Sequence, residues 1–79
     1  MPIKVFLAIT CGRGRIREIH KELRKFDEVS TVCIVENGQF DLVAFVDVES
    51  LEDYRNFSID KVGRLPHIDD YTSFVTLAE

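Results

Sequence analysis

The sequence contains few of the residues that are typical of linkers, low-complexity segments, and metal or redox sites. Among its 79 residues are no tryptophan, two prolines, four glycines and two cysteines. Proline and glycine this scarce leave no linker or low-complexity stretch. Cys11 and Cys33 lie far apart, without C-x-x-C spacing or neighbouring histidines, which argues against the usual metal and redox motifs. We expect both to be small buried side chains in or beside strands, with a disulfide or thiol chemistry as the alternative.

The chain also lacks an excess of positive charge and a long apolar run. Ten Lys and Arg residues stand against fourteen Asp and Glu residues, for a formal net charge of −4. A protein that binds nucleic acid or a membrane surface unaided normally presents a basic face. No apolar run approaches the roughly 20 residues of a membrane span, and residues 1–10 lack the features of a signal peptide. We therefore expect a cytoplasmic protein with no direct contact to nucleic acid or membrane.

What remains is the composition of one small globular domain covering residues 1–79. Hydrophobic residues make up 46% of the chain and charged residues 30%, with no signature of disorder. A core this small is marginal unless something extends it. Oligomerisation is one such extension.

Hydrophobic periodicity predicts alternating strands and helices. The expected elements are a strand at Ile3–Thr10, a helix from Arg15 to about Lys25, strands at Val29–Glu36 and Phe40–Val48, a helix from near Leu51 to Pro66, and a strand at Ile68–Leu77. Asn37-Gly38 predicts a tight hairpin and Ser50 a helix N-cap. The second helix should turn one stripe inward, with Phe57 on its flank: Leu51, Tyr54, Ser58, Val62 and Leu65.

This order of elements predicts an α+β fold of the ferredoxin-like kind. Short connections and right-handed crossovers make a βαββαβ chain a four-stranded antiparallel sheet with two helices on one face. The other face should be polar in a monomer, yet both faces are apolar. In the first strand, Phe6 and Ala8 point away from the face that the inward residues occupy. Val43 and Phe45 point the same way in the third strand. We expect this face to form a dimer interface, because the chain has no spare segment to cover it.

Three short runs carry a resemblance to a known family over the whole chain. They are Gly38-Gln39-Phe40-Asp41-Leu42-Val43 after the hairpin, Leu65-Pro66-His67-Ile68 at the end of the second helix, and Tyr71-Thr72-Ser73 in the last strand. Their order resembles a stand-alone RAM domain of the Lrp/AsnC (feast/famine) transcription regulators, without the helix-turn-helix domain of the larger members. His67 stands where the family usually has Gly, and Tyr71 at the first of two usual Thr positions.

The resemblance implies a module that senses a small effector and assembles. It implies a homodimer, a ring of dimers, and an effector such as an amino acid bound at subunit boundaries. Transcription regulation would then follow from assembly of the module with itself or with a full-length Lrp/AsnC partner. The alternatives are a purely structural assembly module or a small dimeric enzyme of the same fold.

The candidate ligand residues are Gly38, Asp41, Thr72 and Ser73. The Asp41 carboxylate is placed to hold an ammonium group, while Gly38 offers an open backbone N–H to a carboxylate. The alternative is that Asp41 caps its own turn. Thr72 and Ser73 offer strand hydroxyls, although such hydroxyls also commonly face water.

Other candidate sites are weaker. Gly12 and Gly14 with Arg13 and Arg15 resemble an anion site before a helix, but the spacing of a phosphate loop is missing and a simple turn is favoured. The neighbourhood of His67 matches no metal motif. No nucleophile and base stand together, so we expect no enzyme, no metal and no cofactor.

Overall fold

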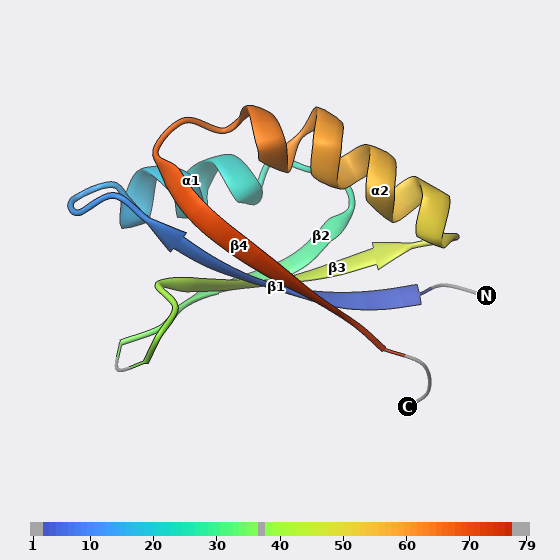
Figure 1. The fold of residues 1–79 in the computed structure, drawn as a ribbon, viewed down its shortest axis with the longest axis horizontal. Coiled ribbons are helices and arrows are strands. Elements are labelled where there is room, and N and C mark those ends of the chain that lie inside the picture. Colours follow the sequence, from blue (N-terminus) through green and yellow to red (C-terminus); the bar gives the residue numbers. More distant parts are fainter. Residues whose placement is uncertain (1–2, 37, 77–79) are drawn as a thin grey trace.

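The computed structural model describes residues 3–36 and 38–76, which form a four-stranded sheet with two helices on one face (Figure 1). The elements are β1 Ile3–Cys11, α1 Ile16–Leu23, β2 Val29–Ile34, β3 Leu42–Val48, α2 Leu51–Asp60, the short 3-10 helix η1 Val62–Arg64, and β4 Ile68–Val75. The strand order is β2-β3-β1-β4, and all neighbours are antiparallel. The predicted ferredoxin-like fold is therefore confirmed. No helix among these residues is long and apolar enough to cross a membrane.

The strands around the hairpin are shorter than the sequence predicts. Strand β2 ends at Ile34 and β3 begins at Leu42, although the apolar pattern extends further on both sides. Val35 and Asp41 still join through one backbone hydrogen bond of 2.9 Å, so the hairpin closes without regular strand geometry. The predicted turn residue Asn37 and the predicted strand end Leu77 lie outside the described residues.

Helix α2 begins where the sequence predicts and ends earlier. The Ser50 hydroxyl accepts a hydrogen bond from the Asp53 N–H at 3.1 Å, which confirms Ser50 as the N-cap. The helix stops at Asp60, and the tighter turn of η1 carries the chain towards Pro66. Gly63 within η1 favours this break, because glycine is a poor helix former. The single long helix expected here is thus wrong.

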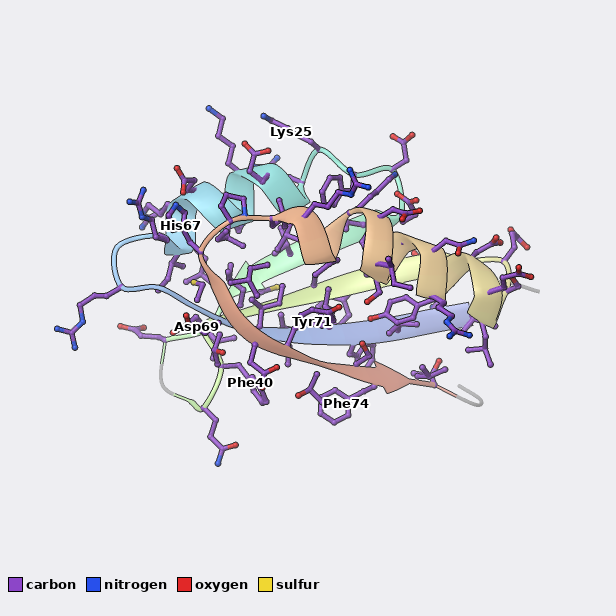
Figure 2. All side chains as sticks on the ribbon, turned by 45° about the horizontal axis from the view of Figure 1, so that its top comes forward. Lys25, Phe40, His67, Asp69, Tyr71 and Phe74 are labelled. Carbon is purple, nitrogen blue, oxygen red and sulfur yellow. The ribbon has the colours of Figure 1, made fainter. Side chains whose placement is uncertain are left out.

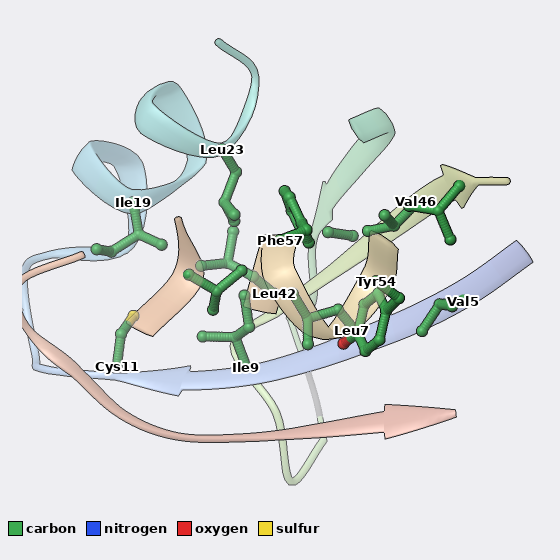
Figure 3. Close-up of a cluster of buried hydrophobic side chains, with 13 residues drawn as sticks. Val5, Leu7, Ile9, Cys11, Ile19, Leu23, Leu42, Val46, Tyr54 and Phe57 are labelled. Atoms are coloured by element: carbon green, nitrogen blue, oxygen red, sulfur yellow. The ribbon is translucent and has the colours of Figure 1, made fainter. Parts of the chain in front are cut away.

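The core fills the space between the helices and the inner face of the sheet (Figure 3). Alternate residues of β1 and β3 are buried in the core: Val5, Leu7, Ile9, Leu42, Ala44 and Val46. The side chains that cover them from α1, α2 and η1 are Ile19, Leu23, Tyr54, Phe57 and Val62. This alternation follows the two-residue repeat of a strand. Phe57 is buried rather than flanking, whereas Leu51 is 58% exposed, so its expected inward position is wrong. Leu51 is the first residue of α2 and lies largely outside the core.

The two cysteines differ in burial, and both are free thiols. Cys11 at the end of β1 is buried as expected, but Cys33 in β2 is exposed. Cys33 pairs with Val43 in the sheet register and therefore shares its outward direction. The expectation that Cys33 is buried is wrong because it faces away from the helices.

Helix α2 is joined to strand β4 by two pairs of hydroxyl groups. The Tyr54 and Ser73 hydroxyls are hydrogen bonded, and the Ser58 and Tyr71 hydroxyl oxygens lie 2.7 Å apart. Burial raises the pKa of the Tyr54 phenol, and the hydrogen bond with Ser73 offsets part of this shift. These contacts position the edge strand β4 against the helix layer.

Candidate functional site

The face of the sheet that the helices leave uncovered carries a row of phenylalanines. Phe6 in β1 is directly opposite Phe45 in β3 and Phe74 in β4. The rings of Phe6 and Phe45 pack edge to face, with centroids 5.0 Å apart and planes at 76°. Phe6 is 40% and Phe74 51% exposed, and Figure 2 shows Phe74 projecting from the side of the sheet away from the helices. We call this surface the open face.

A second row on the open face has smaller side chains. Ala8 pairs with Val43 on one side and with Thr72 on the other. Ala8 is only 4% exposed, and its side chain is a single methyl group. It therefore supplies a flat floor between the larger side chains. On the other side of the phenylalanine row, a depression of ≈ 310 Å³ is lined on the open face by Lys4, Phe6, Thr31, Phe45 and Asp47.

The open face has an apolar centre and a polar margin. Lys4 and Asp47 are directly opposite each other beyond the phenylalanine row. Thr10 and Asp70 are paired at the other end, and the Thr10 hydroxyl donates to the Asp70 carbonyl at 3.3 Å. An apolar centre within a polar rim is the usual anatomy of a protein interface. The residues predicted for the dimer interface, Phe6, Ala8, Val43 and Phe45, occupy its two central strands.

Asp41 lies where the hairpin enters β3 and is fixed by its own backbone. Its N–H donates to the Ile9 carbonyl at 2.8 Å, and its carbonyl accepts from Val35 at 2.9 Å. Its side-chain Oδ2 accepts the Cys11 N–H at 3.0 Å. The carboxylate thus reaches across to β1 instead of capping its own turn. Its Oδ1 has no hydrogen-bond partner among the described residues.

The neighbourhood of Asp41 is unfavourable for thiolate chemistry. Burial raises the pKa of the Cys11 thiol, and the carboxylates of Asp41 and Asp69 raise it further. A raised pKa keeps the sulfur protonated and a poor nucleophile. Cys11 therefore acts as an apolar side chain at the end of β1.

The remaining predicted ligand residues do not share one surface. Thr72 pairs with Ala8 and so faces outward, whereas Ser73 pairs with Leu7 and reaches Tyr54 in the helix layer. Adjacent strand residues point to opposite faces, so Thr72 and Ser73 are separated by the sheet itself. Gly38 is exposed in the β2–β3 hairpin. Of the predicted set, Asp41 has the most defined surroundings.

The loop before β4 contains a feature that the sequence alone did not reveal. His67 adopts a positive φ of 71°, and its carbonyl accepts the Gly12 N–H at 2.9 Å. Its Nε2 lies 3.9 Å from a Glu18 carboxylate oxygen, and the same oxygen lies 3.6 Å from Arg15. His67 is therefore directed to α1. The sequence did contain one signal for this backbone conformation, because His67 stands where the family usually has Gly.

The segment before α1 forms the simple turn that the sequence favours. The Arg15 N–H donates to the Gly12 carbonyl at 3.0 Å, and Gly14 has a φ of 82°. A positive φ is readily adopted by glycine, which has no Cβ. The turn brings the end of β1 directly into α1.

Comparisons with known proteins agree with this fold. The Lrp/AsnC ligand binding domain matches residues 4–79. A search of curated proteins gave no match. Among solved structures, hypothetical protein PHS023 from Pyrococcus horikoshii is 25% identical with a TM-score of 0.90, covering 98% of this chain and 92% of that one. FFRP-DM1 is 24% identical with a TM-score of 0.90, covering 95% and 99%.

A longer relative has the same fold in part of its chain. Transcriptional regulator NMB0573 from Neisseria meningitidis, solved as an L-Met complex, is 19% identical with a TM-score of 0.87. The match covers 98% of this chain but 51% of that regulator. The 79 residues thus have the fold of about half of that regulator. Because the family match spans nearly the whole sequence, the chain belongs to the Lrp/AsnC ligand-binding (RAM) domain family.

Proposed function

We propose that this domain senses a small effector of the amino-acid class and regulates transcription in the cytoplasm through its assembly. It acts by pairing with itself or by mixed assembly with a full-length Lrp/AsnC regulator. The observation that carries the proposal is the open face, where Phe6, Phe45 and Phe74 form one row and Phe6 and Phe74 are exposed. Membership of a family of ligand-binding regulatory domains supports the sensing role.

A symmetric dimer is the simplest way to cover the open face. Burial of apolar surface contributes about 25 cal/mol per Å², so a few hundred Å² supply several kcal/mol towards association. A two-fold axis lets the same patch serve both subunits and closes the assembly. The small floor at Ala8 and Val43 gives the partner's larger side chains room to enter. A ring of such dimers would use surfaces outside the open face.

The effector site is proposed at the hairpin end of the sheet, where a neighbouring subunit completes it. Asp41 Oδ1 is available to an ammonium group while Oδ2 stays bonded to Cys11. Gly38 supplies an exposed backbone, and the Thr72 hydroxyl faces outward on β4. Ser73, bonded to Tyr54, is placed to transmit a change in β4 to helix α2. The L-Met complex of the Neisseria regulator supports an amino acid as the class of ligand.

The assembly part of the proposal is tested by Phe45→Asp. A carboxylate on the open face should dissociate the dimer, as measured by light-scattering mass. Ile59→Asp is the matched control, because Ile59 is 60% exposed on α2 and away from the open face. An unchanged mass for Phe45→Asp, or equal dissociation of both variants, would rule out assembly through the open face.

The sensing part is tested by thermal shift and mass measurements with each common amino acid. At least one should raise the melting temperature, and Asp41→Asn should abolish that rise, since an amide holds an ammonium group less well. If no amino acid changes melting or mass, sensing of this ligand class is refuted. A purely structural assembly module is then the function that the open face supports.

A further inference from the structure

Helix α1 and its flanks concentrate positive charge in an otherwise acidic chain. Residues 13–25 contain six of the ten Lys and Arg side chains and only two carboxylates, Glu18 and Glu22. Arg15 contacts Glu18 at 3.6 Å, and Lys25 contacts Glu22 at 3.2 Å. The other four cations are exposed and form no ion pair within the described part of the chain: Arg13, Arg17, Lys21 and Arg24.

Three of these cations lie along one side of α1. Arg17, Lys21 and Arg24 are spaced four and three residues apart, which places them on one helix face. His20 is also on this side and is half-buried. A groove of ≈ 450 Å³ between α1 and the sheet is lined by His20, Arg24 and residues Val29 to Val32. The free positive charge of α1 thus borders the edge strand β2.

Strand β2 is an edge that no charged residue protects. Its six residues, Val-Ser-Thr-Val-Cys-Ile, include neither a charge nor a proline. The opposite edge, β4, carries Asp69 and Asp70, and the Asp70 carboxylate accepts the Tyr71 N–H at 2.9 Å. Charges and capped N–H groups discourage edge pairing, and their absence leaves a template for another strand.

The backbone of β2 also presents hydrogen-bonding groups outward. The Val35 N–H points into the hairpin, where it donates to Asp41 at 2.9 Å. Because backbone groups alternate in direction along an antiparallel strand, the N–H groups of Val32 and Ile34 point away from β3. An extended segment beside β2 would satisfy them.

We propose that the groove between α1 and the β2 edge docks an extended acidic peptide segment of a partner protein. The segment adds to β2 as a further strand, and its carboxylates contact Arg24 and His20. Backbone pairing supplies affinity and the cations select charge, as in other β-augmentation sites. Ser30 and Thr31 line both this groove and the depression on the open face, so the peptide is titrated against the Phe45→Asp variant to separate docking from the proposed assembly.

The charges favour this occupant over the alternatives. Two-fold pairing of β2 with a second copy would bring both α1 helices and their cations together, and like charges disfavour such contact. Single-stranded nucleic acid is bound through aromatic side chains that stack on its bases. The residues that line the groove include no phenylalanine or tyrosine.

Fluorescence anisotropy with three labelled peptides tests the proposal. The first alternates Glu with Val and Thr, the second has the same charge with a central proline, and the third has Lys in place of Glu. We expect the first to bind, the second to bind at least about tenfold more weakly because proline cannot pair as a strand, and the third not to bind. Arg24→Glu should weaken the first peptide at least about tenfold.

Arg55→Glu is the matched control for Arg24→Glu. It makes the same charge change at an exposed position on α2, outside the groove. Equal losses in the two variants, or equal binding of the proline peptide, would overturn the proposal, since both indicate general charge attraction. Tighter binding of a single-stranded oligonucleotide that displaces the peptide would also overturn it.

A loss of self-association in Arg24→Glu would instead assign the groove to a second copy. Repeating the titration with Phe45→Asp separates this result from the proposed assembly.

Discussion

The Asp41 carboxylate takes the place of a backbone carbonyl at the end of β1. Its Oδ2 accepts the Cys11 N–H at 3.0 Å, beyond the point where the regular β1–β3 pairing stops at Ile9 and Leu42. A side chain therefore extends the ladder to the last residue of β1. This bond holds the hairpin and the turn before α1 at a fixed distance.

Replacing Asp41 with Ala should destabilise the fold. The half-buried Cys11 N–H would lose its partner, which costs about 1–3 kcal/mol. Asp41→Asn should lose less, because the amide oxygen can still accept the bond. Urea unfolding of the three proteins measures the difference. Equal destabilisation by Ala and Asn would show that the negative charge, and not the accepted hydrogen bond, is the stabilising element.

The Ser58–Tyr71 hydroxyl pair between α2 and β4 should contribute to the stability of the fold. Tyr71→Phe removes the partner of Ser58, whose hydroxyl oxygen is 2.7 Å away. We expect a loss of about 1 kcal/mol in the free energy of unfolding. Ser58→Ala should cost a similar amount, and the double variant should cost clearly less than the sum. Additive losses would mean that the contact contributes no interaction energy.

Much of this fold could be predicted because apolar residues repeat with clear periods. The alternation in β1 and β3 assigns Val5 and Leu7 to the core and Phe6 to the open face, as found. The inward side of helix α2 was harder to predict, because the apolar residues Leu51 and Ile59 are exposed. Periodicity registers an apolar residue at a helical spacing, but not whether a neighbouring element covers it.

The surroundings of the candidate site could be predicted only in part. The hairpin position of Asp41 follows from Gly38 and the strand that comes after it. Its bond to Cys11 depends on the pairing of distant strands, which no local pattern encodes. The alternation of Thr72 and Ser73 across the sheet does follow from strand geometry. The charge of α1 is visible in residues 13–25 of the sequence, although the net charge of −4 averages it over the whole chain.

His67→Gly should stabilise the domain. His67 has a φ of 71°, a conformation that costs an L-residue about 1 kcal/mol or more and glycine little. The contact with Glu18, at 3.9 Å and exposed, offsets only a small part of this cost. We expect a net gain of about 0.5–1 kcal/mol in thermal or urea unfolding. Gly14→Ala is the opposite control: its φ is 82° in open space, so it should destabilise through the backbone alone.

The pair formed by Lys61 and Glu28 should make stability depend on acid pH. Lys61 Nζ lies 2.7 and 3.0 Å from the two Glu28 carboxylate oxygens. Burial acts to raise the pKa of Glu28, but hydrogen bonds and the charge of Lys61 outweigh it, and the pKa falls below its usual 4.5. A carboxyl whose pKa is lower in the folded state stabilises the fold above its unfolded pKa. That contribution is lost as pH falls from about 4.5 through the folded pKa.

Lys61→Met tests this dependence while keeping the aliphatic length of the side chain. The variant should be less stable than the parent at pH 7, by no more than about 1 kcal/mol because the pair is partly exposed. The difference should shrink as pH falls from about 4.5 through the lowered pKa of Glu28 in the folded parent. Lys61 also lies 5.5 Å from the centre of the Phe26 ring, and that contact does not titrate with Glu28. A difference that stays constant from pH 7 to pH 3 would therefore assign the role of Lys61 to Phe26 and not to Glu28.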